Sequence, residues 1–455
     1  MHNQENKMGV MPINKLLISM SLPMMISMLV QALYNIVDSI FVAQISENAL
    51  SAVSLAFPFQ QLMISVGTGI GVGVNALLSR YLGAKRPDKA NMVAKCGIFL
   101  SFLSFIVFAL AGLFFTKPFF AFQTNESEIL GFGYSYLIIC TVGSLGIFGQ
   151  IIAEKLLVST GKTKLSMYTQ LSGAITNLIL DPIMIFGYFG CPALGVAGAA
   201  LATVIGQWVA CFVGFVLNVK CNKEISINMK KFKPETSIIG KIFAIGIPSI
   251  IMTSISSVLT FLLNKILISF TTTATAVFGA YFKLQSFIFM PIFGLNNGMV
   301  PIVAYNYGAK RPDRIKKTIK YSITYAVSIM ITGLLIFQIF PEFLLGFFNA
   351  SEEMLKIGVP ALRTISLSFT FAGICIISCS VFQALGKSLV SMFVSILRQL
   401  VVLLPVAYAF SLTRNINLVW FAYPIAEVVA VIFCVYMMIR IHKTLINKLK
   451  EPENV

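Results

Sequence analysis

A six-residue phrase that occurs twice constrains this chain more than any other feature. The phrase Gly83–Asp88 (GAKRPD) returns as Gly308–Asp313, about 225 positions later. The same shift works elsewhere without a gap: Pro23 falls on Pro248, Gln60 on Gln285, Gly69 on Gly294 and Gly73 on Gly298. Two copies of one unit predict a molecule built of two related halves that share an interface.

The composition predicts that the solvent of both halves is lipid. Hydrophobic residues make up 57% of the 455 positions and charged residues only 11%, which does not suit a surface facing water. Apolar runs of about 20 residues or more, the length that crosses a bilayer, recur twelve times. They cover 14–43, 49–80, 92–116, 127–155, 163–187, 194–218, 239–269, 274–306, 317–340, 353–384, 388–411 and 416–440.

These runs predict an all-α integral membrane protein with twelve transmembrane helices in two pseudo-symmetric six-helix bundles. We expect an N-lobe at 14–218 and a C-lobe at 239–440, joined by a polar, basic linker at 219–238 and flanked by tails at 1–13 and 441–455. Each lobe has an even number of spans, so an axis along the membrane normal relates the two. The first twelve residues lack the features of a secretory signal, so the first span should remain in the mature protein.

The positive charges predict which side of the membrane each loop occupies. The net charge is +17, and of the 34 Lys and Arg about 27 fall in the tails, the linker and the even-numbered loops. Such loops stay in the cytoplasm. We therefore expect a multi-pass protein of the bacterial cell (inner) membrane with both termini cytoplasmic. The charge indicates contact with anionic lipid headgroups rather than with nucleic acid.

Cysteine and histidine give no sign of catalysis. Most of the eight cysteines lie inside predicted spans, and the two histidines, His2 and His442, lie in the tails. No spacing matches a metal site or a catalytic set, and GAKRPD lacks the pattern of a phosphate-binding loop. We expect no enzymatic activity, no metal centre and no cofactor apart from a coupling ion.

Acidic side chains within the first lobe predict an ion site. An ionisable group at bilayer depth costs about 2.5 to 3.5 kcal/mol, so each one asks for a function. A rise of about 1.5 Å per residue places Asp38 and Asp181 at similar depth, with Asn177 one turn before Asp181 and Thr203 nearby. The positions 225 residues later hold Leu263, Val402, Val406 and Val428. A purely structural hydrogen-bonding role would more naturally occur in both halves, so we favour cation or proton coupling.

Two further features have a structural and a functional reading. Arg398 and Glu427 in the second lobe are expected to form an ion pair on neighbouring helices, with ion or substrate binding as the alternative. Pro23 and Pro248 should kink their spans at matching depth and are candidates for gating.

Four motifs resemble the multidrug and toxic compound extrusion (MATE) family over essentially the whole twelve-span region. They are Asn35–Asp38 (NIVD), Tyr81–Arg86 (YLGAKR), Asn177–Pro182 (NLILDP) and Leu194–Ala200 (LGVAGAA). The chain looks closer to the DinF and MepA-like bacterial branch than to NorM. The NorM branch carries acids in spans 7 and 10, whereas here only Glu353 lies at the outer edge of span 10.

The resemblance implies a V-shaped pair of lobes that exports drugs and bulky organic cations in exchange for H+ or Na+. Asp38, Asn177, Asp181 and Thr203 match the first-lobe network of DinF-like members, where either ion is an option. In that picture, protonation of Asp38 shifts span 1 around Pro23 and shrinks the cavity of the lobe.

We therefore expect a multidrug efflux antiporter that works as a monomer by alternating access on amphipathic, mostly cationic molecules. A flippase for lipid-linked saccharide would need more cavity Lys and Arg, and an intramembrane enzyme would need a catalytic set. The residues expected to face the substrate, mainly through aromatic and thioether surface, are Gln31, Tyr34, Asn35, Phe57, Gln60, Met63, Met252, Ser256 and Gln285.

Overall fold

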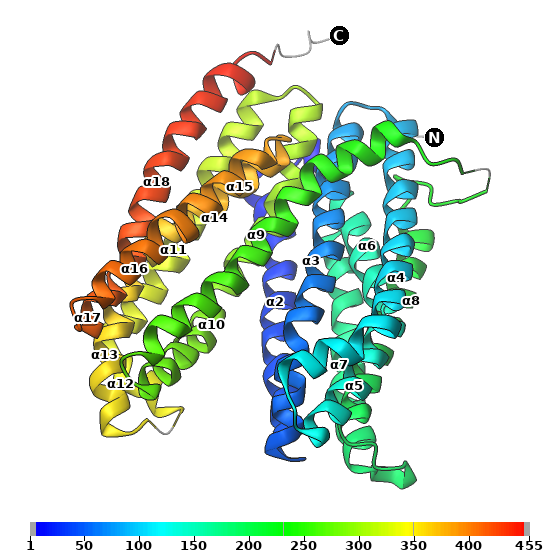
Figure 1. Cartoon of the computed structure of the whole chain (residues 1–455). Helices are drawn as coiled ribbons and strands as arrows, with labels where there is room; N and C mark the ends of the chain where they lie inside the picture. The colour runs from blue at the N-terminus through cyan, green and yellow to red at the C-terminus, as the bar shows by residue number, and fades with distance from the viewer. Residues whose placement is uncertain (1–5, 231, 349, 450–455) are drawn as a thin grey trace. The chain divides into compact units, whose positions relative to one another are not determined.

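The fold was examined in a computed structural model that describes residues 6–230, 232–348 and 350–449. Within these residues every regular element is a helix (Figure 1). The first half holds α1 (Lys7–Val10), α2 (Ile13–Ala43), α3 (Glu47–Gly83), α4 (Pro87–Gln123), α5 (Ser127–Val142), α6 (Leu145–Ser159), α7 (Thr163–Phe186), η1 (Tyr188–Gly190) and α8 (Val196–Cys221). The second holds α9 (Thr236–Ile268), α10 (Thr272–Gly308), α11 (Pro312–Ile339), α12 (Pro341–Gly346), α13 (Glu352–Ser366), α14 (Phe369–Ala384), α15 (Ser388–Ile396), η2 (Leu397–Leu403), α16 (Leu404–Ser411), α17 (Ile416–Trp420), α18 (Ala422–Ile441) and η3 (His442–Ile446).

The predicted spans agree with these helices, with two breaks that the sequence analysis did not predict. In the described part of the chain, nine helical segments are long and apolar enough to cross a membrane. Two further spans are bent pairs: α5 and α6 meet at 46°, and α13 and α14 at 48°. The breaks fall at Gly143 and Leu367. With the shift of about 225 positions, Gly143 corresponds to position 368, so the two breaks lie at nearly the same place in the two copies. The remaining predicted span, α7, has 24 residues but is not among the segments that are apolar enough to cross a membrane by composition.

The repeated phrase has the same local structure in both halves. It closes α3 and opens α4 in the first half, and it closes α10 and opens α11 in the second. Lys85 and Lys310 both adopt a left-handed backbone with φ of 55°. Pro87 and Pro312 then begin the next helices, where a residue without an N–H loses no hydrogen bond. The phrase is therefore a tight turn between two long helices.

The chain divides into two compact units, and each unit contains part of one helix from the other half of the sequence. One unit comprises Ile26–Ile250, and the other comprises Met1–Met25 with Ile251–Val455. The divisions cut α2 after Met25 and α9 after Ile250, in each case two residues beyond the helix proline, Pro23 or Pro248. The first part of α2 thus belongs to the second unit, and the first part of α9 belongs to the first.

The duplicated glycines explain how these helix pieces pack. A Cβ on Gly73 of α3 would lie 2.4 Å from the backbone oxygen of Ile242 in α9. In the other unit, a Cβ on Gly294 of α10 would lie 2.4 Å from the Cα of Met25 in α2. Only glycine allows such close backbone contact between helices. Each unit therefore contains a close crossing of two helix backbones at a duplicated glycine.

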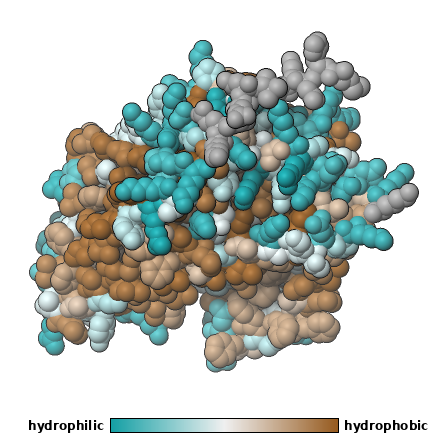
Figure 2. All heavy atoms as spheres, turned by 90° about the horizontal axis from the view of Figure 1, so that it is seen from above, coloured by the Kyte–Doolittle hydropathy of each residue, from teal (hydrophilic) through white to brown (hydrophobic). Residues whose placement is uncertain are grey.

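The surface separates apolar flanks from a polar end. Figure 2 looks onto the end at which α18 finishes, and hydrophilic side chains gather on that face while hydrophobic ones cover much of the flank. Exposed apolar residues such as Phe114, Phe212 and Ile432 are 66 to 71% exposed, which water would penalise and lipid would not. This pattern is typical of a protein that crosses a bilayer.

Candidate functional site

Asn177 links two helices of the first unit through its side-chain amide. Its Nδ2 donates to Oδ1 of Asp181, one turn later on α7, at 3.1 Å, and it lies 3.3 Å from Oγ1 of Thr203 on α8. Asn177 and Asp181 are both buried, at 4% and 1% exposure. The spacing of four residues places the amide and the carboxyl on one helix face. These three predicted site residues therefore do meet.

Asp38 of α2 completes the cluster. Its carboxyl group is a neighbour of that of Asp181, and the two interact electrostatically. Oδ1 of Asp38 and Oδ2 of Asp181 are buried and have no hydrogen-bond partner among the described residues. Buried oxygens without a partner are costly, and a bound proton or cation would satisfy them. The arrangement is chemically suited to take up and release one positive charge.

The cluster adjoins a small cavity of about 40 Å³ whose walls are rich in amides. The volume has room for ordered water. Gln170 donates to Oε1 of Gln31 across the cavity at 2.8 Å, and Gln150 donates to Glu154 at 2.9 Å. The lining residues are Gln31, Tyr34, Gln150, Gln170, Gly173, Ala174, Asn177, Thr203, Gly206 and Gln207.

Three of these amides were not predicted from the sequence. Gln150, Gln170 and Gln207 lie in predicted spans in which only the acidic residues and their polar neighbours indicated a site. A helical signal was present, because Gln170 precedes Asn177 by two turns and Gln207 follows Thr203 by one. The cavity wall is thus more polar than the aromatic and thioether surface that was expected.

The other predicted substrate residues of this unit lie apart from the cavity lining. Asn35 and Phe57 are exposed, Phe57 at 58%. Gln60 lies within 3.4 Å of both the hydroxyl of Tyr136 and the sulfur of Cys140. Met63 is a correction: it is only 2% exposed and packs in a hydrophobic cluster with phenylalanines, so it supplies core and not cavity surface.

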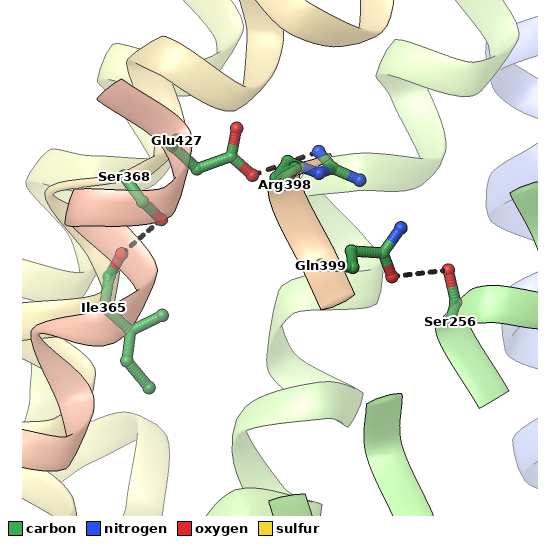
Figure 3. A network of polar contacts seen from close by, with 6 residues as sticks. All are labelled: Ser256, Ile365, Ser368, Arg398, Gln399 and Glu427. Atoms are coloured by element: carbon green, nitrogen blue, oxygen red, sulfur yellow. Dashed lines mark hydrogen bonds and ion pairs between the residues drawn. The ribbon is translucent and has the colours of Figure 1, made fainter. Parts of the chain in front are cut away.

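The substrate residues predicted in the second unit make partly polar contacts of their own. The hydroxyl of Ser256 on α9 donates to Oε1 of Gln399 at 3.2 Å (Figure 3). Nε2 of Gln383 lies 3.6 Å from the sulfur of Met252. Gln285 is partly exposed on α10. These three residues thus lie on α9 and α10 of the second unit.

Arg398 and Glu427 contact each other in the second unit. Nη1 of Arg398 donates to Oε1 of Glu427 at 3.0 Å, between η2 and α18 (Figure 3). Their side chains are 22% and 11% exposed. Arg398 lies in a π-helical stretch, an irregularity that often marks a functional position. Oε2 of Glu427 is buried without a recorded partner in the described part of the chain.

The described residues contain no group of three or more His, Cys, Asp or Glu side chains that could hold a metal ion. The eight cysteines are free thiols.

Comparison with known proteins agrees with the repeat. The model of the MatE family matches residues 23–183 and again 248–409, so it finds the same two copies. The chain is 28% identical over 431 residues to the multidrug export protein MepA of Staphylococcus aureus (strain MSSA476), covering 94% of each chain. It is 29% identical over 436 residues to MepA of Staphylococcus haemolyticus (strain JCSC1435), covering 96% of this chain and 94% of that one.

Solved structures share the fold over nearly the whole length. One is the outward-facing conformation of a multidrug resistance MATE family transporter of the MOP superfamily, with a TM-score of 0.92 and 25% identity. Another is a MOP superfamily transporter from Pyrococcus furiosus, with a TM-score of 0.91 and 25% identity. Each comparison covers 98% of this chain and 99% of the other.

Proposed function

The chain belongs to the MatE family, and from that premise we propose that it is a multidrug exporter that expels amphipathic, mostly cationic molecules in exchange for H+ or Na+. Its relatives named MepA are multidrug export proteins, and its structural neighbours are transporters and not enzymes. The proposal that substrates are cationic rests on the acids near the amide-lined cavity, because negative charge favours organic cations.

The observation that carries the coupling mechanism is the pair formed by Asp38 and Asp181. Two carboxyl groups that share a buried site cannot both hold a negative charge at low cost. An entering H+ or Na+ neutralises one charge, and Asn177 and Thr203 offer polar atoms to orient it. Entry of an ion releases about 2.3 kcal/mol per 100 mV of potential, and each pH unit adds about 1.4 kcal/mol. Such energies shift a two-state carrier substantially.

Bound ion and bound drug would then alternate. The cavity lined by Gln31 and Tyr34 lies beside Asn177, and at about 40 Å³ it admits water or a coupling ion but not a drug. We propose that it widens during the transport cycle, so that a cationic substrate comes close to the acids. A proton or Na+ at the acids removes the charge that attracts the substrate, which favours its release. Departure of the ion on the other side of the membrane restores the attraction for the next substrate molecule. We propose Pro23 and Pro248 as the kinks at which α2 and α9 bend during this exchange.

The proposed location is the bacterial cell membrane, with both termini in the cytoplasm and a monomer as the working unit. The chain is a multi-pass membrane protein with bacterial relatives. The concentration of Lys and Arg in the tails, the linker and alternate loops supports the orientation.

Transport by purified protein in liposomes tests the proposal. We expect ethidium export driven by an imposed pH or Na+ gradient, and a reduction of about tenfold or more in Asp38→Asn and Asp181→Asn. Asp88→Asn, which alters an exposed acid in the repeated phrase, is the matched control and should transport normally. Running both gradients in parallel identifies the ion. An Asp38→Asn protein that exports at the wild-type rate under either gradient would refute the coupling role.

A further inference from the structure

The segment from Met8 to Met11 docks on the second copy of the repeated phrase. Nη1 of Arg311, within that phrase, donates to the carbonyl oxygen of Gly9 at 2.5 Å. Arg314 donates through Nη2 to the carbonyl oxygens of Met8 at 3.1 Å and Met11 at 2.7 Å. Nδ2 of Asn306 also donates to Met8, at 3.1 Å. Two guanidinium groups and one amide therefore hold the carbonyls at the end of α1.

The docked segment is also packed. Met8, Leu16 and Leu17 are fully buried in the hydrophobic core of the second unit. A Cβ on Gly9 would lie 3.2 Å from the ring of Tyr305, so the backbone sits directly against that ring. The buried side chains of this segment, Met8, Ile13, Leu16 and Leu17, are thus part of the unit's core.

The arginines have no competing acidic partner. Nε of Arg314 donates to Oδ1 of Asn306 at 3.0 Å, which orients both side chains toward the N-terminal segment. Within residues 6–230, 232–348 and 350–449, neither Arg311 nor Arg314 forms an ion pair with Asp or Glu. Hydrogen bonds from a charged donor are stronger than neutral ones. The contacts to the segment are therefore the main polar interactions of these two side chains.

The first copy of the phrase lacks this arrangement. The repeat aligns Arg311 with Arg86 and Arg314 with Lys89, and both counterparts are exposed. In the described part of the chain, no side-chain hydrogen bond of Arg86 or Lys89 is seen; Lys89 lies 5.9 Å above the ring of Tyr81. The two copies of the turn thus differ in their contacts. Among the described residues, the arginines at the second copy hold a segment of the chain, whereas Arg86 and Lys89 at the first copy do not.

The docked segment continues directly into the helix that carries Asp38. Residues 13–25 of α2 stay in the second unit, where Oγ of Ser21 donates to the carbonyl oxygen of Leu295 at 3.3 Å. After Met25 the same helix enters the first unit and supplies Gln31 and Asp38. Pro23, which removes a helix hydrogen bond, lies just before the transition. One end of α2 is therefore anchored in one unit and the other end carries the ion site of the other.

We propose that Arg311 and Arg314 are positioning residues for transport, which lock the start of α2 so that a change at Asp38 bends the helix at Pro23. Without the lock, α2 shifts as a whole along its axis, and the change at the acids is not converted into bending. This proposal rests on the proposed export function. The two arginines touch neither the acidic cluster nor the cavity, so they act through α2 alone.

The repeated phrase supplies its own control for the experiment. We compare Arg311→Ala/Arg314→Ala with Arg86→Ala/Lys89→Ala, reconstituted in liposomes at equal density. The first variant should lose about tenfold in maximal ethidium export with an unchanged half-saturating concentration, whereas the second stays near wild type. Arg311→Lys/Arg314→Lys keeps the charge and should recover part of the rate.

The rate of hydrogen exchange at the backbone amides of residues 6–14 measures directly how firmly this segment is held. Exchange should rise in Arg311→Ala/Arg314→Ala and stay unchanged in the matched control. Should the double variant lose its folded structure, Asn306→Leu replaces it: this change removes the amide that donates to Met8 and that accepts from Arg314, and a smaller loss of export is expected. A variant with faster exchange but full export overturns the proposal, as does one whose exchange is unchanged. If wild-type protein and the matched control both fail to export under either gradient, the proposed function itself is wrong.

Discussion

The amide of Asn177 joins the carboxyl group of Asp181 on α7 to the hydroxyl of Thr203 on α8, and replacing it tests the cluster. Hydrogen bonds to charged partners contribute about 1.5 to 3 kcal/mol. We expect Asn177→Ala to weaken coupling-ion binding by about tenfold or more, since Asp181 loses its donor, and Thr203→Val to have a smaller effect. The measurement is the ion concentration that half-activates export.

Thr176 provides the control for this change. Its hydroxyl donates only to the carbonyl oxygen of Ser172 within α7, at 2.7 Å. Thr176→Ala should therefore leave ion activation as it is. Equal effects of the two substitutions would show that Asn177 acts by supporting the helix and not by ordering the carboxyl group.

The ion pair of Arg398 and Glu427 yields a prediction on stability. Removal of one partner leaves a buried charge unpaired, which costs about 3 to 5 kcal/mol, whereas removal of both is often tolerated. We expect Glu427→Gln and Arg398→Met to lower the unfolding temperature in detergent, and Arg398→Met/Glu427→Leu to recover most of the loss. A double variant that is stable but no longer exports would indicate direct participation in binding.

At this scale the sequence predicted the cluster but not its surroundings. Asn177 and Asp181 are four residues apart on one helix, a spacing that is readable without coordinates. The contact of Gln31 with Gln170 joins helices 139 positions apart, and no local pattern encodes it. Met63 was misplaced because a flexible thioether suits a cavity wall and a core equally well.

The helix crossings test how strictly the duplicated glycines are required. Gly73→Ala places a methyl 2.4 Å from a backbone oxygen, and Gly294→Ala places one 2.4 Å from a Cα, so neither neighbour can move aside cheaply. We expect both variants to lose folded protein and to unfold at lower temperature. Gly279→Ala, inside α10 with open space around its Cβ, should be neutral or stabilising by about 0.5 to 1 kcal/mol.

The unfolding temperature of the purified variants in one detergent checks this set. Gly73→Ala and Gly294→Ala should both show the loss, because in each case the added methyl would meet backbone atoms of the crossing helix in the same unit. If all three alanine variants unfold together, helix propensity rather than close packing determines the outcome.

The elements themselves were largely predictable, because a run of about 20 apolar residues in lipid has few alternatives to a helix. What the pattern does not contain is the partner of each helix. The first parts of α2 and α9 join the unit opposite to their own repeat, a choice made by backbone contact at Gly294 and Gly73. The break at Gly143 leaves the apolar run intact and so leaves no trace in hydropathy.

For the whole molecule, duplication supplied a scaffold whose copies then diverged. The first copy holds the carboxyl pair at Asp38 and Asp181, where the second has Leu263 and Val406. The second copy holds the Arg398 ion pair and the docked N-terminus. Because the scaffold is shared, each difference between corresponding positions points to a task that belongs to one half.

The orientation of the chain depends on whether α7 crosses the membrane, because it is the one predicted span that is too polar to qualify by composition. Its polar residues, including Gln170, Asn177 and Asp181, face the interior of the first unit. Its outer face shows Ile175, Leu178 and Ile179, each 42 to 56% exposed. A helix with an apolar outer face and a polar face shielded by protein is compatible with lipid.

We therefore expect α7 to span, which makes the number of crossings even and puts both termini on the same side. A fluorescent protein that matures only in the cytoplasm should fluoresce when it is fused after residue 455 or inserted after residue 230 in the linker. Alkaline phosphatase, active only outside, should work when inserted between α7 and α8, near Gly190. Phosphatase activity at the C-terminus, with fluorescence in the linker, would mean that the second half makes an odd number of crossings. Fluorescence near Gly190 would mean that α7 does not cross, and that its buried acid, Asp181, lies at a membrane edge.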